Sequence, residues 1–417
     1  MLMIPYGKTH LPFEEGNAAV LRSRIGELRA EQNGADLVRA AMDAPIGSPK
    51  LSELAKDKRN CVIIISDHTR PVPSRDILPH MLRGLKQGNP EIEIILLVAT
   101  GCHRAASSAE LEAKLGREIL NAVPVVMHDC RDKARNVSIG TLPSGTDCVI
   151  DRLAAETDLL VAEGFIEPHF FAGFSGGRKS VLPGICDEVT VFGNHCSRFI
   201  DSPYARTGIL DGNPLHADML AAAKLAKLAY IVNVIIDEDK KTVAAFAGDF
   251  EQAHRRGCDF LLDYCRVPAA PADIVLTSNG GAPLDQNLYQ CVKGMTAGEA
   301  TCREGGTIIL CAECADGHGG EGFYRDLAEC RSPEDLYAQF LAVPQDQTPQ
   351  DQWQSQVLAR ILMKYRVIVV TRPAMRGIVE DMKMLWAATP EEAVAMAKDM
   401  GGKTLTVIPD GISVIVR

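Results

Sequence analysis

The chain has 417 residues, which is too long for one ordinary hydrophobic core and predicts two or three domains. Its 44 lysines and arginines against 54 aspartates and glutamates give a net charge of −10, so no overall field exists to attract nucleic acid. With 46% hydrophobic and 24% charged residues, and no apolar run near the roughly 20 residues that span a bilayer, the composition excludes membrane and disordered proteins.

The segment from Met1 to Leu11 lacks the basic and apolar regions of a secretory signal, which predicts a cytoplasmic protein. The 13 cysteines are spread along the chain, and several lie in apolar runs where a reduced cysteine is a small hydrophobic residue. A disulfide framework is therefore not expected.

Short β-branched runs alternate with helical patterns, which predicts an α/β fold with mostly parallel sheets. The first expected strand, Val62 to Ile65, leads into the polar segment 66–71, and a helix is expected over 74–87. The second strand, Ile92 to Ala99, leads into the polar segment 100–104, after which Ser107 or Ser108 can cap a helix. Both polar segments therefore fall at turns from strand to helix.

A third polar cluster follows the expected strand from Leu159 to Phe165. It contains Glu167-Pro168-His169 and a glycine-rich segment from Gly173 to Lys179. Ligands of open α/β sheets bind at the carboxyl ends of the strands, so the three clusters are expected to share one site.

The glycine-rich segment has two interpretations. The amides of Gly176 and Gly177 could cradle a phosphate, with Arg178 and Lys179 adding positive charge. The pattern of an ATP-hydrolysing P-loop nevertheless fails, because Arg178 stands where the second required glycine belongs. The alternative is a glycine turn before a helix.

A second α/β unit is expected after the segment 267–273, where two prolines interrupt any regular element. Its strands are expected at 274–277, 307–311 and 367–371, with a helix-to-helix connection around 345–352. Pro409-Asp410-Gly411 predicts a turn, and the runs 405–408 and 412–416 on either side could form a hairpin that returns to the first domain. The predicted domains are 1–267, to which 403–417 returns, and 268–402.

Cys311 and Cys314, with His318 nearby, have the spacing of zinc ligands, but no second such pair of cysteines accompanies them. Packing in the core and in a turn is the favoured interpretation.

Among the ten histidines, His103, His169 and His195 each follow a strand or a glycine-containing segment. Each alone is more often structural than catalytic. Imidazole serves as a base, an acid or a metal ligand, so several histidines in one pocket would indicate chemistry. Asp67 and Arg70 could orient a polar ligand, with a helix cap and a surface salt bridge as the alternative.

The segment from Thr277 to Gly294 joins an expected strand to a helix through a polar turn. Tyr289 and Lys293 lie four residues apart and share a face of that helix, with Gln290 beside them. This face is expected to close the pocket from across the cleft between the domains.

Taken together, these motifs resemble the lactate racemase family, whose members use a nickel-pincer nucleotide. Several long motifs in a fixed order carry the resemblance, and they are far more specific than one glycine pattern. They lie at 66–73, 101–104, 167–184, 193–195, 212–216 and 278–294.

The resemblance implies two α/β domains with the active site in the cleft between them. It also implies a cofactor that composition and spacing do not reveal, a pyridinium-3-thioamide-5-thiocarboxylic acid mononucleotide that holds Ni(II) through sulfur, carbon and sulfur. By the same resemblance Lys179 carries this cofactor covalently, His195 coordinates nickel, and His103 and His169 are the catalytic bases. The resemblance further implies cofactor contacts from Asp67, Thr69, Arg70, Ser175, Gln290 and Lys293, and substrate contacts from Arg70, Tyr289, Gln290 and Lys293.

The implied activity is the interconversion of enantiomers of a small 2-hydroxy acid, with lactate as the expected substrate. Hydride would leave C2 for the cofactor while a histidine takes the hydroxyl proton, and hydride could return to either face of the planar 2-keto acid. Proteins that synthesise the cofactor are implied partners.

Two other functions stay open from the sequence. One is a noncatalytic protein that binds or stores the nickel cofactor or another phosphorylated small molecule, and the other is a nucleotide-dependent transferase. The presence of both His103 and His169 favours the enzyme, because storage would need only Lys179 and His195. Arg178 in the glycine-rich segment disfavours the transferase.

Overall fold

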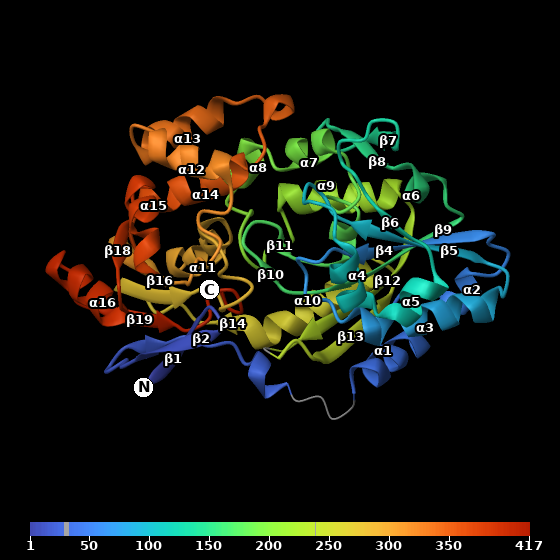
Figure 1. Cartoon of the computed structure of the whole chain (residues 1–417), viewed down its shortest axis with the longest axis horizontal. Helices are drawn as coiled ribbons and strands as arrows, with labels where there is room; N and C mark the ends of the chain where they lie inside the picture. Colours follow the sequence, from blue (N-terminus) through green and yellow to red (C-terminus); the bar gives the residue numbers. More distant parts are fainter. Residues whose placement is uncertain (29–32, 238) are drawn as a thin grey trace.

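A computed structural model describes residues 1–28, 33–237 and 239–417, and it contains two six-stranded sheets in the two halves of the molecule (Figure 1). All strand pairs of the second sheet are parallel, and in the first sheet only the edge strand β13 (Thr242–Gly248) runs antiparallel to its neighbour. The predicted α/β fold with mostly parallel sheets is therefore confirmed.

The first sheet has the strand order β13-β12-β9-β4-β5-β6. Its central strands are almost fully buried, and Ile63, Ile64 and Ile65 are each 0% exposed, which explains why they form continuous apolar runs. The strands predicted at 62–65, 92–99 and 159–165 are confirmed. The bounds of the sheet are β4 (Asn60–Ser66), β5 (Glu93–Ala99), β6 (Val125–Met127), β9 (Leu159–Phe165), β12 (Leu228–Ile236) and β13 (Thr242–Gly248).

Helices and two short hairpins surround this sheet. Ser107 caps α4 as predicted, because its side chain accepts a hydrogen bond from the Glu110 amide while the Glu110 carboxylate accepts one from the Ser107 amide. The hairpins are β7 (Asn136–Thr141) with β8 (Asp147–Asp151), and β10 (Pro168–His169) with β11 (Gly173–Phe174). The helices are α1 (Gly34–Asp43), α2 (Leu51–Leu54), α3 (Ser74–Gly88), α4 (Ser108–Leu115), α5 (Arg117–Ala122), α6 (Arg152–Glu156), α7 (Glu188–Asn194), α8 (Ser197–Asp201), α9 (Pro214–Leu225) and α10 (Gln252–Cys265), with 3-10 turns η1 (Ile25–Glu27) and η2 (Gly177–Ser180).

The second sheet has the order β18-β17-β16-β15-β19-β3. The strands predicted at 274–277, 307–311 and 367–371 correspond to β15, β16 and β17, and η3 (Gln345–Gln347) lies in the predicted connection between two helices. The elements are β15 (Ala272–Ser278), β16 (Cys302–Cys311), β17 (Arg366–Val370), β18 (Leu385–Ala387), α11 (Leu288–Glu299), α12 (Glu321–Glu329), α13 (Pro333–Ala342), α14 (Gln352–Leu362), η4 (Pro373–Met375), α15 (Arg376–Asp381) and α16 (Pro390–Asp399).

The predicted C-terminal hairpin is wrong. Strand β19 (Leu405–Ile408) lies between β15 and β3 (Ala19–Val20) and is parallel to both, because its apolar residues Val407 and Ile408 are fully buried inside the second sheet. Strand β20 (Ile415–Val416) instead pairs in parallel with β14 (Arg266–Val267).

Segments near both chain ends therefore belong to the second sheet, although the prediction assigned them to the first domain. The N-terminal hairpin of β1 (Leu2–Tyr6) and β2 (Thr9–Phe13) packs its buried Leu2, Ile4 and Phe13 into the apolar cluster of that sheet. The division into 1–267 and 268–402 stays a prediction. Among the described residues, no helix combines the length and the apolar character needed to cross a bilayer.

Candidate active site

A cavity of about 240 Å³ lies where the loops after β4, β5 and β9 meet the start of α11. These three strands are neighbours in the first sheet, so the structure confirms that the three polar clusters converge on one place. Of the predicted site residues all but Thr69 line the cavity, namely Asp67, Arg70, His103, His169, Ser175, Lys179, His195, Tyr289, Gln290 and Lys293.

Asp67 and His103 form a hydrogen-bonded pair on one wall. The Nδ1 atom of His103 is 2.7 Å from Oδ2 of Asp67, and Oδ1 of Asp67 accepts a 2.7 Å bond from the Thr69 hydroxyl. Burial raises the pKa of Asp67, but the hydrogen bond and charge of His103 outweigh burial and bring that pKa to about 2. An ionised carboxylate only accepts, so Nδ1 of His103 carries a hydrogen and Nε2 is the ring nitrogen that can exchange a proton with a ligand.

Thr69 therefore acts through Asp67 and not on the cavity itself. The alternative of a helix cap by Asp67 is wrong, because α3 starts after Pro73 and has no side-chain cap. The backbone of Arg70 is fixed by Lys114, whose Nζ donates a 3.1 Å bond to the Arg70 carbonyl, and the Arg70 side chain lines the cavity.

The glycine-rich segment forms β11 and η2, and Arg178 is turned away from the cavity. Arg178 is 1% exposed, and its Nη atoms donate 2.7 Å bonds to the carbonyls of Ala172 and Phe174. The expectation that Arg178 adds charge to a phosphate cradle is wrong. The guanidinium is used to hold the carbonyls of its own loop, which would otherwise be buried without partners.

Lys179 points the other way and meets His169. Its Nζ lies 3.2 Å from Nε2 of His169, while Nδ1 of His169 accepts a hydrogen bond from the Ala172 amide at 3.3 Å. Since Nδ1 is the acceptor, Nε2 of the neutral ring carries the hydrogen and faces the lone pair of an uncharged amine.

The electrostatics of this pair agree with the geometry. Burial, together with the charges of Arg178, Arg70 and Lys293, holds the pKa of Lys179 well below its ordinary value. Burial likewise holds the pKa of His169 well below 6.5, and the positive charges of Lys293 and Arg70 lower it further. An uncharged amine is a nucleophile, so Lys179 is suited to covalent attachment.

His195 ends α7 and presents one free ring nitrogen. Its Nδ1 donates a 2.9 Å bond to the Val191 carbonyl, so the lone pair lies on Nε2. Burial lowers the pKa of His195 to about 3. The ring is held between Phe171, with centroids 5.3 Å apart, and Trp353, with centroids 5.0 Å apart. A neutral imidazole with an oriented lone pair can coordinate a metal ion.

The first two turns of α11 close the cavity from the second sheet, as predicted. Nζ of Lys293 donates a 2.7 Å bond to Oε1 of Gln290, and burial lowers the pKa of Lys293 to about 8. The Tyr289 hydroxyl donates a 2.9 Å bond to Asp351, and burial with the Asp351 charge raises the pKa of Tyr289.

No pattern in the sequence indicated the residues that line the cavity at the start of α14. Asp351, Trp353 and Gln354 line it, and the Gln354 amide donates to the Tyr289 carbonyl. Asp351 has φ of 68°, a strained conformation for a residue with a side chain. The segment 345–352 has only the pattern of a polar connection, and the one distinctive residue nearby is Trp353, which follows it and is one of two tryptophans in the chain.

The cysteine pair with zinc-like spacing is divided between two apolar clusters. Cys311 packs in the cluster beneath the N-terminal hairpin, and Cys314 packs in the main cluster with its Sγ 4.0 Å from Sγ of Cys291. Within the described part of the chain, no group of three or more His, Cys, Asp or Glu residues is arranged to hold a metal ion.

Comparison with known families gives two matches that together span most of the chain. The lactate racemase N-terminal domain matches residues 6–208, and the lactate racemase C-terminal domain matches residues 267–416.

Individual proteins are similar along nearly the whole length. A lactate racemase from Thermoanaerobacterium thermosaccharolyticum is 52% identical over 419 residues, which cover 99% of this chain and 98% of the relative. A lactate racemase from Lactiplantibacillus plantarum is 50% identical over 419 residues, which cover 99% of each protein.

Solved structures agree. The structure of the lactate racemase apoprotein from Thermoanaerobacterium thermosaccharolyticum matches with a TM-score of 0.97 and 51% identity, covering 100% of this chain and 99% of that one. A crystal structure of a protein from Thermotoga maritima matches with a TM-score of 0.65 over 89% of this chain and 99% of that one. At 19% identity the second match shows a shared fold alone.

Proposed function

The chain belongs to the lactate racemase family and is an isomerase of the racemase type, and on that premise we propose that it interconverts the two enantiomers of lactate. The observation that carries the proposal is one cavity in which His103 and His169 lie together with Arg70 and Lys293. A 2-hydroxy carboxylate requires both a group that handles its hydroxyl proton and a positive clamp for its carboxylate.

The family is nickel-dependent, and the residues of the cavity fit the nickel-pincer nucleotide. Lys179 offers an uncharged amine for attachment, and Nε2 of His195 offers a lone pair for nickel. Ser175 and Gln290 line the same cavity and add polar contacts. When bound, the nucleotide supplies an electrophilic carbon that accepts hydride from C2 of the substrate.

The protein's own groups supply the remaining steps. As hydride leaves C2, the hydroxyl proton passes to Nε2 of His103 for one enantiomer and to the imidazole of His169 for the other, which gives a planar 2-keto acid. Arg70 and Lys293 hold the carboxylate, and Tyr289, whose hydroxyl is bonded to Asp351, lines the same cavity. Return of hydride to the other face of C2, with return of a proton to the carbonyl oxygen, yields the other enantiomer.

A storage role is not favoured. Storage of a nucleotide does not require the Asp67 and His103 pair, in which a buried carboxylate fixes the orientation of a base. The full-length identity of about half to lactate racemases also supports turnover.

The proposal extends to the surroundings in which the protein works. All thirteen cysteines are free, and all but Cys102 and Cys330 are buried, which supports a reducing compartment such as the cytoplasm. Proteins that synthesise the nucleotide are proposed partners, because this chain would receive the group already made.

The deciding experiment follows deuterium at C2 of lactate in ordinary water, with holo protein. In hydride transfer the label does not become a histidine proton, so we expect the inverted product to retain deuterium. Mass spectrometry of each enantiomer at low conversion measures the retention.

Direct proton abstraction by His103 and His169 would instead exchange the label with solvent. Early washout of deuterium would contradict hydride transfer, whereas absence of inversion by protein that carries its nucleotide and nickel would contradict racemisation itself.

A further inference from the structure

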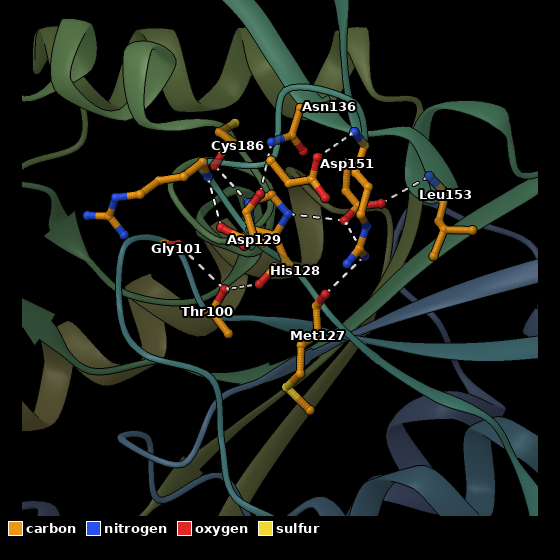
Figure 2. Close-up of polar contacts among 12 residues, drawn as sticks. Thr100, Gly101, Met127, His128, Asp129, Asn136, Asp151, Leu153 and Cys186 are labelled. Carbon is orange, nitrogen blue, oxygen red and sulfur yellow. Dashed lines mark hydrogen bonds and ion pairs between the residues drawn. The ribbon is translucent and has the colours of Figure 1, made fainter.

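A buried cluster of polar residues lies behind the cavity wall and has no part in the reaction described above (Figure 2). Its centre is His128, which follows β6 and has 0% of its side chain exposed, and Asp151, which ends β8 with 1% exposed. Charged groups are rarely buried unless they are paired, so burial of this pair indicates a specific structural role.

Both ring nitrogens of His128 face acceptors. Nδ1 is 3.1 Å from Oδ2 of Asp151, and Nε2 is 2.9 Å from the carbonyl oxygen of Cys186. Because a carboxylate and a carbonyl only accept, both nitrogens must carry hydrogens, and the ring is an imidazolium. Asp151 balances this charge, and it also accepts bonds from Arg135 at 3.3 Å and from the Leu153 amide at 3.1 Å.

The backbone of His128 is joined to the loop that carries His103. The Thr100 hydroxyl donates a 2.8 Å bond to the His128 carbonyl, and the His103 amide donates a 2.9 Å bond to the Thr100 carbonyl. Figure 2 shows Thr100 directly beside His128.

The ring of His128 is joined to the loop that carries Lys179. The ring contacts the carbonyl of Cys186, which lies two residues after Gly184. The Gly184 amide donates a 3.2 Å bond to the Lys179 carbonyl. A direct link between the two loops runs alongside, since the Gly101 amide donates a 3.0 Å bond to the Gly184 carbonyl. Asp151 secures the second loop as well, because its amide donates a 2.9 Å bond to the Ile185 carbonyl.

We propose that His128 and Asp151 are positioning residues, a buried imidazolium and carboxylate that fix the loop of His103 against the loop of Lys179. The inference rests on the proposed function, in which one loop supplies a base and the other holds the reactive group. A misplacement of about 1 Å between such groups costs rate without loss of substrate binding, so the network acts on kcat.

Two substitutions of His128 separate its two contacts. In His128→Asn the side-chain amide occupies the place of Nδ1, so it keeps the hydrogen bond to Asp151 and loses the one to the Cys186 carbonyl. In His128→Gln the amide occupies the place of Nε2, so it keeps the hydrogen bond to the Cys186 carbonyl. We expect kcat per loaded protein to fall about tenfold or more in His128→Asn with KM within about twofold, and to fall less in His128→Gln.

The control for loss of stability alone is Leu85→Ala, because Leu85 is a fully buried residue of α3 that does not line the cavity. The positioning role is overturned if His128→Asn and His128→Gln lose the same kcat, or if Leu85→Ala of equal stability loses as much. Intact mass gives the loaded fraction, so failure of racemisation by wild-type protein remains distinguishable from failure of this proposal.

A measurement on the wild-type apoprotein tests the charge state without any variant having to fold. Two protonated ring nitrogens are expected for His128 at pH 7.5 in nitrogen-15 NMR, with the signal assigned by its absence from one folded His128 variant or by its contacts to Thr100. A ring with one unprotonated nitrogen would overturn the proposal.

Discussion

Lys179 has an environment that ordinary lysines avoid. Its amine lies beside a histidine and 5.7 Å from the centre of the Phe171 ring, and among the described residues no carboxylate is within ion-pair distance. Cations therefore surround it on several sides, and the uncharged amine is the stable form.

We expect Lys179→Ala to abolish covalent loading when the protein is made together with the cofactor-synthesis proteins. Intact-mass spectrometry should show the adduct on wild type and the bare chain for the variant. Lys293→Ala is the matched control, because this second buried lysine of the cavity should keep the adduct and lose turnover. An adduct retained on Lys179→Ala would refute the assignment.

His195 gives a prediction about the metal. Loss of the Nε2 lone pair in His195→Ala should lower bound nickel at least tenfold, since one ligand of the metal is removed. Nickel per chain, measured by elemental mass spectrometry on purified protein, is the readout. His103→Ala should keep its nickel and lose activity, and equal nickel contents in all three proteins would return His195 to a structural role.

For single residues, the sequence predicted which ones line the site but not where their side chains point. Asp67, His103, His169, Lys179 and His195 all reach one cavity as the resemblance implied. Arg178 and Lys179 are adjacent and both basic, yet only the folded loop shows that one binds carbonyls and the other faces the cavity. Side-chain direction in an irregular loop depends on tertiary contacts that no local pattern encodes.

Among the elements, the turn before η2 determines where Lys179 stands. Gly176 has φ of +73°, and a Cβ there would lie 2.7 Å from Oδ1 of Asn233 and 2.8 Å from the Phe165 carbonyl oxygen. Oδ1 of Asn233 already accepts the Gly177 amide at 2.7 Å. The turn therefore needs glycine both for its backbone conformation and for the space.

Gly176→Ala should destabilise the protein by more than the cost of placing an alanine at a positive φ. Gly305 has a similar φ of +78° with nothing within 4 Å, so Gly305→Ala measures the backbone cost of about 1 kcal/mol by itself. We expect Gly176→Ala to cost roughly 1 to 3 kcal/mol more, because of overpacking. Urea unfolding of the two variants is the comparison, and equal losses would show that the close contacts are unimportant.

The sequence also predicted most elements, because long apolar runs form central parallel strands whatever surrounds them. Strand β9 matches its predicted bounds of Leu159 to Phe165. Strand β3 has only two residues, Ala19 and Val20, both exposed, so no pattern marks it. The run 412–416 has the apolar pattern of a strand, but its pairing with β14 depends on the path of the whole chain.

For the whole molecule, the expected arrangement of two α/β units with a site between them holds, although the two units share chain segments. The cavity takes its bases from the first sheet and its clamp partly from α11, so both sheets must be folded for the site to exist. The interior of the first unit also buries His254, which is 3% exposed and lies against the loop of Arg178 with its Nε2 2.8 Å from the Ser175 carbonyl.

This burial makes stability depend on pH. Burial and the charge of Arg178 hold the pKa of His254 well below 6.5 in the folded protein, whereas the unfolded chain takes up the proton near pH 6.5. As pH falls below 6.5 the unfolded state binds more protons, so the free energy of unfolding decreases. The stabilisation is thus present above pH 6.5 and is lost toward acid.

We expect the advantage of the wild-type apoprotein over His254→Gln to shrink by about 1 kcal/mol between pH 6.5 and 5.5. Urea unfolding at pH 7.5, 6.5 and 5.5 measures it, and His10→Gln, which replaces an exposed histidine, is the control whose difference from wild type should not follow this slope. Acid lability from carboxylates is common to all three proteins and cancels in the differences. A pH-independent gap between wild type and His254→Gln would mean that the His254 ring is protonated in the fold, which would place two cations, this ring and Arg178, in contact inside the interior.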